Sequence, residues 1–562
     1  MAEDKRKSFR RNSLLQTAFA LALLVLLNVI SSFVFVRIDL SAEKRFSLAD
    51  STKQRMKSLK DVAYVKVYLD GDLPPAYMRL RNAVKELLDE FKAYAGDNLE
   101  YEFIDPSASA DPSERNKLYQ QLAQKGIQPT NISVRGKGET TQKIILPGAI
   151  LNYNGKEIPL QLLKSRIGMG AEEMVNSSVE NLEYEFMNGI RKANIQFRKR
   201  IAFLQGHGEL STTQLADAAR SVSDAYEADT VVINGNLSAL KKYKALVVAK
   251  PDSAFTEKDK FIIDQFVMNG GKVLWFIDQM YMDMDSLAAT NTNVAVARNL
   301  NLDDLLFSYG ARVNYDLVTD MQAAPIPVVT GYVGNQPQQN LFPWYYFPLI
   351  NPVSVHPIVH NLNAVKLEFA STTDTVEAEG VRKTVLLSTS RYSNMQQAPI
   401  RVSLNILQQE PDPRMFTKHA LPVALLLEGS FSSPFRNRIP ASIANDPGIG
   451  FKTQGAPAKM IIVGDGDLIA SHISKKGKVF PMGYDRFTGE TYGNLSFFLN
   501  CVDYLLNEGD LMSLRAKEFK IRLLDKSKSG EEWVKWANLL VPVALVAIFG
   551  LLSFVIRKRR YA

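Results

Sequence analysis

One histidine and one glutamate lie where the sequence allows chemistry. His207 and Glu209 belong to the segment QGHGE, directly after the apolar run RIAFL, which is typical of a buried strand. Open α/β sheets bind ligands beyond the carboxyl ends of their strands, so these two side chains are candidates for a polar-ligand crevice. No serine or cysteine lies beside them to act as a nucleophile. The segment therefore favours a structural turn, with a ligand crevice as the functional alternative and catalysis as the least favoured interpretation.

Three other patterns resemble functional motifs but fit structural roles better. The segment GDGDLIA lacks the third glycine of a dinucleotide fingerprint, and Asp465 and Asp467 would repel a pyrophosphate. His356 and His360 have the spacing of a helical metal pair, but neighbouring prolines break such a helix. Met280 and the methionines two and four positions later fit a loop packed inward better than a soft-metal site. From these segments we expect structural turns and loops.

The inventory of residues excludes several classes of function. The single cysteine, Cys501, excludes a disulfide framework, a CxxC redox motif and a multi-cysteine zinc site. No GxxxxGK[ST] segment is present, so the chain is not itself a P-loop ATPase. With 46% hydrophobic and 22% charged residues, the composition is that of a folded protein. We therefore expect a folded protein with no catalytic residue, no cofactor and no metal.

The positive charge is concentrated at the two ends of the chain. Residues 1–13 contain five basic and two acidic side chains, and residues 557–562 contain four basic side chains and no acidic one. Because the net charge is +8, the long body between these tails is almost neutral. Binding of nucleic acid needs a concentrated basic surface, so a nucleic-acid partner is disfavoured.

Two long apolar segments flank the body. Leu14 to Val36 comprises 23 uncharged residues, which is long enough to cross the hydrocarbon core of a bilayer. The runner-up interpretation, a cleaved signal peptide, has a shorter apolar stretch. The second segment, 538–556, follows Trp533 and Trp536, which suit the interface between membrane and water. We therefore predict two transmembrane helices, at 14–36 and 538–556.

The predicted topology follows from the basic tails. Basic residues stay on the cytoplasmic side, so both termini are expected in the cytoplasm and the body in the periplasm, with the inner membrane between them. In the second span, Gly550 and Ser553 are small residues of the kind that let transmembrane helices approach closely. They are candidates for packing against a partner helix.

The body is predicted to hold two α/β domains. Residues 37–196 alternate in the order βαβαββ before a long helix at 171–196, the order of a thioredoxin-like domain, here without a CxxC motif. Residues 197–510 alternate strands and helices around long insertions, and FVMNGGKVLWFID resembles the flavodoxin-like, glutamine-amidotransferase-like architecture. Active amidotransferases use a cysteine on a strand-to-helix elbow, whereas Cys501 lies in a late helix, so that activity is rejected. Residues 511–537 are read as a juxtamembrane segment.

Several segments, in their order along the chain, resemble one known family. They are RIDLSAEKRFSL, YEFIDPSA, FLQGHGEL, GSFSSPFRNRIP, IIVGDGDLIA and NLSFFLNCVDYLLNEGDLMSLRAK. In that order between two spans, they resemble the GldG family of gliding-motility-associated ABC transporter auxiliary components of Bacteroidetes. The resemblance implies a non-catalytic membrane subunit that acts with a multispanning permease and, through it, a cytoplasmic ATPase.

Residues and resemblance together predict a membrane-anchored extracytoplasmic subunit linked to gliding motility. It would couple the permease and the ATPase to a client protein of the cell envelope, and membrane lipid would surround its spans. Two alternatives from other classes stay open. One is a solute-binding component that captures a small ligand in the crevice near His207, and the other is a cryptic envelope hydrolase.

Overall fold

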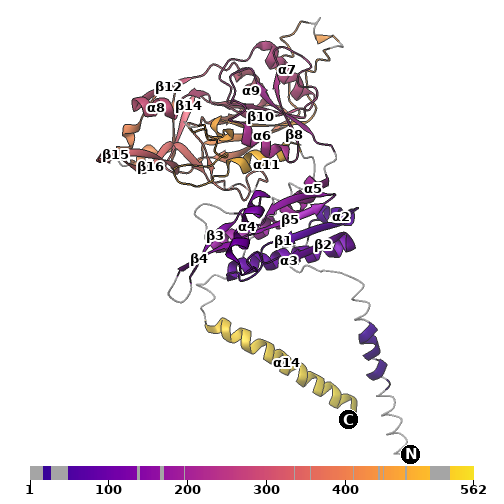
Figure 1. Cartoon of the computed structure of the whole chain (residues 1–562). Helices are drawn as coiled ribbons and strands as arrows, with labels where there is room; N and C mark the ends of the chain where they lie inside the picture. Colours follow the sequence, from indigo (N-terminus) through magenta and orange to yellow (C-terminus); the bar gives the residue numbers. More distant parts are fainter. Residues whose placement is uncertain are drawn as a thin grey trace, which may run out of the picture. The chain divides into compact units, whose positions relative to one another are not determined.

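The computed structural model shows a mixed α/β chain, in agreement with the predicted fold class (Figure 1). The basic tail at 1–13, most of the predicted span 14–36 and most of the juxtamembrane segment 511–537 lie outside the described residues. The structure describes residues 15, 17–19, 21–26, 48–135, 140–164, 170–194, 197–334, 336–352, 354, 356–408, 411–440, 444–446, 449–474, 477–506 and 532–561.

The first sheet has four strands in the order β2-β1-β5-β6. Strands β1 and β2 pair in parallel, whereas β5 pairs antiparallel with both β1 and β6. A parallel pair needs a crossover connection, and helix α3 (Pro75–Ala95) supplies it. A separate hairpin, β3–β4, precedes β5. The strands are β1 (Ala63–Val67), β2 (Leu99–Phe103), β3 (Thr130–Arg135), β4 (Thr140–Ile145), β5 (Gly148–Tyr153) and β6 (Lys156–Gln161).

Two long helices pack together at this sheet. The apolar spacing of residues 75–95 predicts an amphipathic helix. Along α3, Leu80, Val84, Leu88 and Phe91 are buried at helical spacing, which confirms that prediction. The Phe91 ring meets Phe186 of α5 (Ala171–Asn194) edge to face. The remaining helices of this region are α2 (Asp50–Lys57) and α4 (Pro112–Gln124). These contacts belong to the main hydrophobic core of residues 48–194, and a smaller second cluster includes Leu122 of α4.

The second sheet has seven strands in the order β19-β22-β23-β10-β9-β7-β8. The five strands from β23 to β8 run parallel, and β22 and β19 add an antiparallel edge. The predicted alternation of strands and helices beyond residue 197 is therefore confirmed as a mostly parallel sheet. The strands are β7 (Arg200–Gln205), β8 (Glu227–Val232), β9 (Ala245–Ala249), β10 (Lys272–Phe276), β19 (Val381–Ser388), β22 (Pro422–Gly429) and β23 (Ala458–Val463).

Helices cover both faces of the second sheet, and its central strands are buried on both sides. Alternate residues of β10 enter two separate cores: Leu274 and Phe276 one, Val273 and Trp275 the other. The first core includes side chains of α6 (Ala216–Ser223) and α11 (Asn494–Leu506). The second includes side chains of α7 (Glu257–Met268) and α9 (Asp303–Tyr309).

A β-rich insertion follows β10. Its core gathers Trp344 with Met280 and Met282, so these methionines pack inward as the sequence predicted. Residues 321–363 are rich in proline and aromatic residues, and the sequence predicts that they form a long ordered excursion. Within them, β15 and β16 pair as a long hairpin (Figure 1). The elements are β11 (Met280–Tyr281), α8 (Met284–Thr290), β12 (Thr292–Ala297), β13 (Ala311–Val313), β14 (Asp316–Asp320), β15 (Ala323–Val333), β16 (Gln336–Ile350), β17 (Val365–Lys366), β18 (Thr373–Thr375), β20 (Ser393–Gln397) and β21 (Ile400–Ser403).

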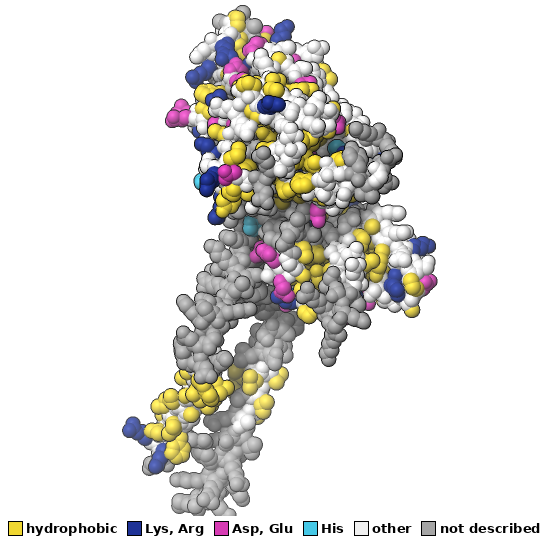
Figure 2. All heavy atoms as spheres, turned by 90° about the vertical axis from the view of Figure 1, so that its left-hand side faces the viewer, with side chains coloured by type: hydrophobic (Ala, Val, Ile, Leu, Met, Phe, Trp, Pro, Cys, Tyr) yellow, Lys and Arg dark blue, Asp and Glu magenta, His cyan; other side chains and the backbone are white. Residues whose placement is uncertain are grey.

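The C-terminal helix α14 (Glu532–Tyr561) belongs to a separate unit of the chain. Its stretch Trp536–Ile556 has a mean hydropathy of 2.8 and none of it is buried. It is the one helix among the described residues that is long and apolar enough to cross a membrane. Apolar side chains run along this helix and basic ones lie at its end (Figure 2). Within the first predicted span, the described part is a shorter apolar helix, Thr17–Leu26.

The packing of α11 on the second sheet gives a stability test. Phe498 is fully buried, and its ring lies 6.4 Å from that of Phe203 and 6.2 Å from that of Phe276. Removing it leaves a cavity between helix and sheet, so we expect Phe498→Ala to destabilise the chain by about 3–5 kcal/mol. The measurement is the urea midpoint of the full chain in detergent, followed by circular dichroism. Phe307→Ala is the control, because that ring is 57% exposed; equal shifts for the two variants would refute the packing described.

Candidate functional site

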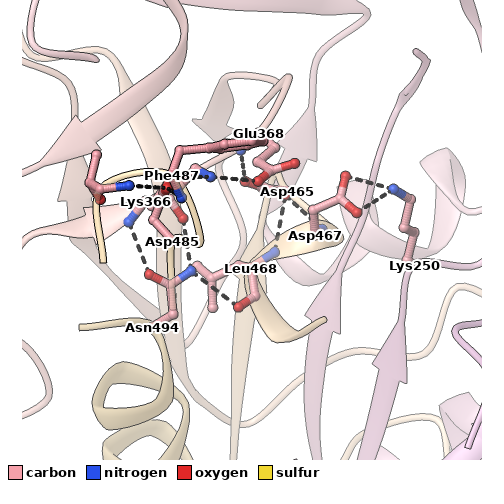
Figure 3. Close-up of polar contacts among 10 residues, drawn as sticks. Lys250, Lys366, Glu368, Asp465, Asp467, Leu468, Asp485, Phe487 and Asn494 are labelled. Carbon is pink, nitrogen blue, oxygen red and sulfur yellow. Dashed lines mark hydrogen bonds and ion pairs between the residues drawn. The ribbon is translucent and has the colours of Figure 1, made fainter. Parts of the chain in front are cut away.

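The carboxyl ends of three neighbouring parallel strands carry charged residues. Lys250 directly follows β9, Asp278 closely follows β10, and Asp465 and Asp467 closely follow β23. Strands in this register end at the same edge of the sheet, which is where open α/β sheets place their ligand sites. The second sheet therefore brings one ammonium and three carboxyl groups together. Figure 3 shows Lys250 with Asp465 and Asp467.

Lys250 supplies the positive charge of this cluster. Its Nζ lies 3.0 Å from Oδ2 of Asp278 and 2.6 Å from both carboxylate oxygens of Asp467. Burial by itself would lower the pKa of the Lys250 ammonium, but the two carboxylates raise it well above its ordinary value. The backbone of Lys250 has φ +53°, a left-handed conformation that costs free energy in a residue with a side chain. The surrounding contacts hold this strained residue in place.

Asp465 is the most enclosed carboxyl group of the cluster. It is fully buried and accepts hydrogen bonds from the backbone N–H groups of Asp467, Leu468 and Glu368, at 2.7, 3.2 and 2.7 Å. These donors favour the charged form. Burial outweighs them, and with the nearby carboxylates of Asp278 and Asp467 it raises the pKa of Asp465 well above its ordinary value. Asp465 therefore holds its proton more tightly than an exposed aspartate does.

Two glycines let the turn after β23 approach its neighbours. A Cβ atom at Gly464 would lie 2.2 Å from the carbonyl oxygen of Ser371. One at Gly466 would lie 2.6 Å from Cβ of Lys250, and the N–H of Gly466 donates to Oδ1 of Asp278 at 2.5 Å. The glycines of GDGDLIA thus serve close packing around the charge cluster.

A second lysine extends the network toward α11. Nζ of Lys366, at the end of β17, lies 2.9 Å from Glu368 and 3.4 Å from Asp485. The amide group of Asn494, the first residue of α11, donates to the carbonyls of Lys366 and Leu468 at 2.8 and 3.2 Å. It also accepts from the N–H of Lys366 at 3.0 Å. The start of α11 is therefore tied to the site (Figure 3).

A cavity of about 250 Å³ lies beside this network. Its lining includes the charged groups of Lys366, Glu368 and Asp467 and the aromatic rings of Phe347 and Tyr484. Among the described residues that line it there is no serine, threonine or cysteine, but His472 and Asp485 add further ionisable groups. A cavity lined by charged and aromatic side chains suits the binding of a small polar ligand.

The three carboxyl groups could also attract a cation. Oxygen atoms of Asp278, Asp465 and Asp467 lie within 4.8 Å of one another, a spacing that an oxygen-preferring cation could bridge. However, the ammonium of Lys250 already lies against Asp278 and Asp467. The cluster therefore fits internal neutralisation by a lysine better than a metal centre.

The predicted crevice residues lie elsewhere on the same sheet, after β7. The ring of His207 lies 3.3 Å from Glu209 through Nδ1 and 3.2 Å from Asp259 through Nε2, and it stacks on Phe255 at 3.9 Å. Burial would lower the pKa of His207, but the two carboxylates raise it overall. His207 and Glu209 are only 6% and 9% exposed, so their polar atoms mainly meet each other and Asp259. The ligand crevice near His207 stays a prediction.

Sequence reasoning missed Lys250, Asp278, Lys366 and Glu368. It read GDGDLIA only as a turn, because that segment was tested against a dinucleotide motif. A partial signal was present, because charged residues closely follow three apolar strands, β9, β10 and β23, but the sequence does not show that these strands are neighbours in the sheet. Cys501 is fully buried within α11, in keeping with its exclusion as a nucleophile.

Removing the ammonium of Lys250 tests the charge cluster. Lys250→Met leaves the buried carboxylates without a counter-charge, so we expect a loss of about 3–5 kcal/mol at neutral pH. Without the ammonium, the folded variant would raise the pKa values of the buried carboxyl groups above those of the unfolded chain. The loss of stability therefore becomes smaller as these groups bind protons on acidification. The gap in thermal midpoint between wild type and variant should narrow from about pH 8 to about pH 5.

The matched control is Lys242→Met, which breaks an exposed pair with Asp229 and should shift the midpoint little at any pH. A gap that stays constant over this pH range would contradict the role given to Lys250.

Comparison with known proteins identifies the family to which most of the second α/β region belongs. The family model of the ABC-type uncharacterized transport system matches residues 198–501, more than half of the chain. A second model, the domain of unknown function DUF7088, matches residues 42–152. No curated protein matches the chain. A solved structure titled "mmIFT52 N-terminal domain" is 12% identical, with a TM-score of 0.31, over 55% of this chain and 98% of its own. The chain belongs to the auxiliary-component family of the ABC-type uncharacterized transport system.

Proposed function

We propose that the chain is a non-catalytic, membrane-anchored subunit that couples an ABC permease and its cytoplasmic ATPase to a client protein of the cell envelope. The observation that carries this proposal is the family match over 198–501, followed by the apolar helix Trp536–Ile556. The chain has no P-loop of its own, so ATP hydrolysis has to come from a partner. One or two spans are also too few to enclose a transport pathway.

The link to gliding motility rests on the sequence segments that resemble the GldG family. With both basic tails in the cytoplasm, the two α/β regions would lie in the periplasm and the spans in the inner membrane. The permease would contact the spans, and the body would relay motion driven by the ATPase to the envelope client.

We assign the first region to the thioredoxin-like class and the second to the amidotransferase-like class. The order β2-β1-β5-β6, with one parallel and two antiparallel pairs, supports the first assignment. Five parallel strands with helices on both faces support the second. In both regions the catalytic cysteine of the enzymes with these folds is missing, which supports a scaffold role.

A solute-binding component is the second candidate function. The cavity lined by Lys366, Glu368 and Asp467 favours it, because its position at the carboxyl edge is where such folds hold ligands. In that case the ligand would meet this cavity instead of the enclosed pair His207 and Glu209.

A substitution in α14 tests docking on a permease. None of the apolar stretch Trp536–Ile556 is buried, and a Cβ atom at Gly550 would meet no atom within 4 Å. We expect Gly550→Leu to leave membrane insertion intact but to reduce co-purification of the permease by about tenfold, because close helix approach is lost. Co-purification is quantified by mass spectrometry after affinity capture from solubilised membranes.

The control is Ala544→Leu, which introduces the same leucine side chain on a different side of the helix, six positions earlier. Ser553 lies one turn after Gly550, so Ser553→Leu should behave like Gly550→Leu. Co-purification unchanged in both Gly550→Leu and Ser553→Leu would exclude docking through this face.

Cysteine labelling tests the topology. The single native cysteine, Cys501, is fully buried, so it contributes little background to a thiol reagent. We expect Ser238→Cys, at an exposed position of the body, to react with a membrane-impermeant maleimide once the outer membrane is permeabilised. Ser8→Cys should stay unlabelled until the inner membrane is opened. Labelling at position 8 after permeabilisation of the outer membrane alone would reverse the proposed orientation.

A further inference from the structure

A larger cavity lies at the opposite, amino-terminal edge of the second sheet. Its volume is about 680 Å³, and its lining comes from residues at the starts of parallel strands. Lys199 precedes β7, Lys244 precedes β9 and Pro457 precedes β23, while Lys272 is the first residue of β10. The site is therefore separate from the charge cluster, which lies where these strands end.

The cavity has a basic end. Lys199, Lys241, Lys244 and Lys272 line it, and no aspartate or glutamate belongs to its described lining. Lys241 and Lys244 are exposed, and neither ammonium has an ion-pair partner among the residues that the structure describes. Unbalanced positive charge around a concave surface attracts an anion and concentrates it there.

The cavity continues into an apolar trough. A neighbouring depression of about 570 Å³ shares the side chains of Leu237, Phe261 and Ile262 with it. The trough extends past Phe435, whose ring meets that of Phe261 edge to face at 5.5 Å, and past Ile439. Leu237 is 48% exposed although it is apolar. The trough is mainly apolar, although Glu257, Lys258 and Arg438 also line it. One continuous depression thus has lysines without acidic neighbours in its described lining at one end and a mainly apolar surface at the other.

The turn between α7 and β10 shapes the floor of the basic end. Gly270 has φ +84°, and a Cβ atom at Gly271 would lie 2.5 Å from the Phe266 ring. Only glycine permits both the left-handed turn and this close approach of backbone to ring. The Phe266 side chain therefore stays folded under the turn and lines the cavity.

We propose that this depression binds an anionic amphiphile, with its acidic head group on Lys241 and Lys244 and its hydrocarbon chain along Leu237 and Phe261. A free inorganic anion would leave the trough exposed to water, and an uncharged hydrocarbon would leave the lysines unused. A fatty-acid carboxylate and an anionic phospholipid share the chemistry required. The inference does not depend on the transporter role.

Photolabelling tests the site in the full chain, held in nanodiscs of phosphatidylcholine. The probe is dodecanoate with a diazirine in its chain, and labelled peptides are mapped by mass spectrometry. We expect crosslinks within 235–272, and about tenfold less labelling in the double variant Lys241→Gln, Lys244→Gln. The control Lys242→Gln changes the intervening lysine, which pairs with Asp229 and does not line the cavity, and should label like wild type.

Competition identifies the chemistry that is bound. Unlabelled dodecanoate, or phosphatidylglycerol in the nanodisc, should suppress the crosslinks. Suppression by dodecanoate identifies free fatty acid as the source of the ligand, and suppression by phosphatidylglycerol identifies membrane lipid. Dodecanol has the hydrocarbon chain without the charge, and inorganic phosphate has the charge without the chain, so neither should suppress the crosslinks. The proposal is wrong if inorganic phosphate or dodecanol competes equally, if only an acidic peptide competes, or if the double variant labels as strongly as Lys242→Gln.

Discussion

The ammonium group of Lys250 is the constraint on which the carboxyl edge of the second sheet depends. The ends of β10 and β23 bring three carboxyl groups within 4.8 Å of one another, and such groups repel one another when charged. Lys250 contacts Asp278 and Asp467 from a left-handed backbone, and Gly466 is needed because any side chain there would collide with that lysine. From this centre the network runs through Asp465 and Glu368 to the start of α11. The positions of the parallel strand ends, the glycine turn after β23 and the start of α11 therefore all depend on the pairing of Lys250 with the carboxylates.

The contacts that these charged side chains already make limit the functions that they can serve. Asp278 and Asp467 face a lysine, Asp465 faces backbone N–H groups, and His207 lies between two carboxylates on another part of the same sheet. Catalytic groups need a free reactive atom within reach of a substrate. Most of these groups have a partner, although Nδ1 of His207 and Oε1 of Glu209 make no hydrogen bond with the described residues. Charged groups paired in this way stabilise a scaffold, which agrees with the non-catalytic role proposed for this member of the transporter family.

The sequence predicted local elements well wherever periodicity was strong. The apolar spacing in α3 and the alternation of strands and helices after residue 197 correspond closely to the structure. The charge cluster was not predictable in the same way, because Lys250 and Asp467 lie 217 positions apart and meet only after the strands are ordered in the sheet. Short apolar runs show that strands exist, but they do not show which strands are neighbours. Lys366 and Glu368 belong to the β-rich insertion, and the sequence did not show where that insertion packs against the second sheet.

The central claim, that this chain works as a subunit of an ABC transporter complex, is tested most directly by native mass spectrometry. The intact protein would be captured from solubilised membranes of its own cells, and the masses of the complexes would be assigned by dissociation into subunits. The account predicts a complex in which this chain accompanies a multispanning permease and an ATPase in fixed ratio. Recovery of the chain alone, or only with copies of itself, from gently solubilised membranes would contradict it.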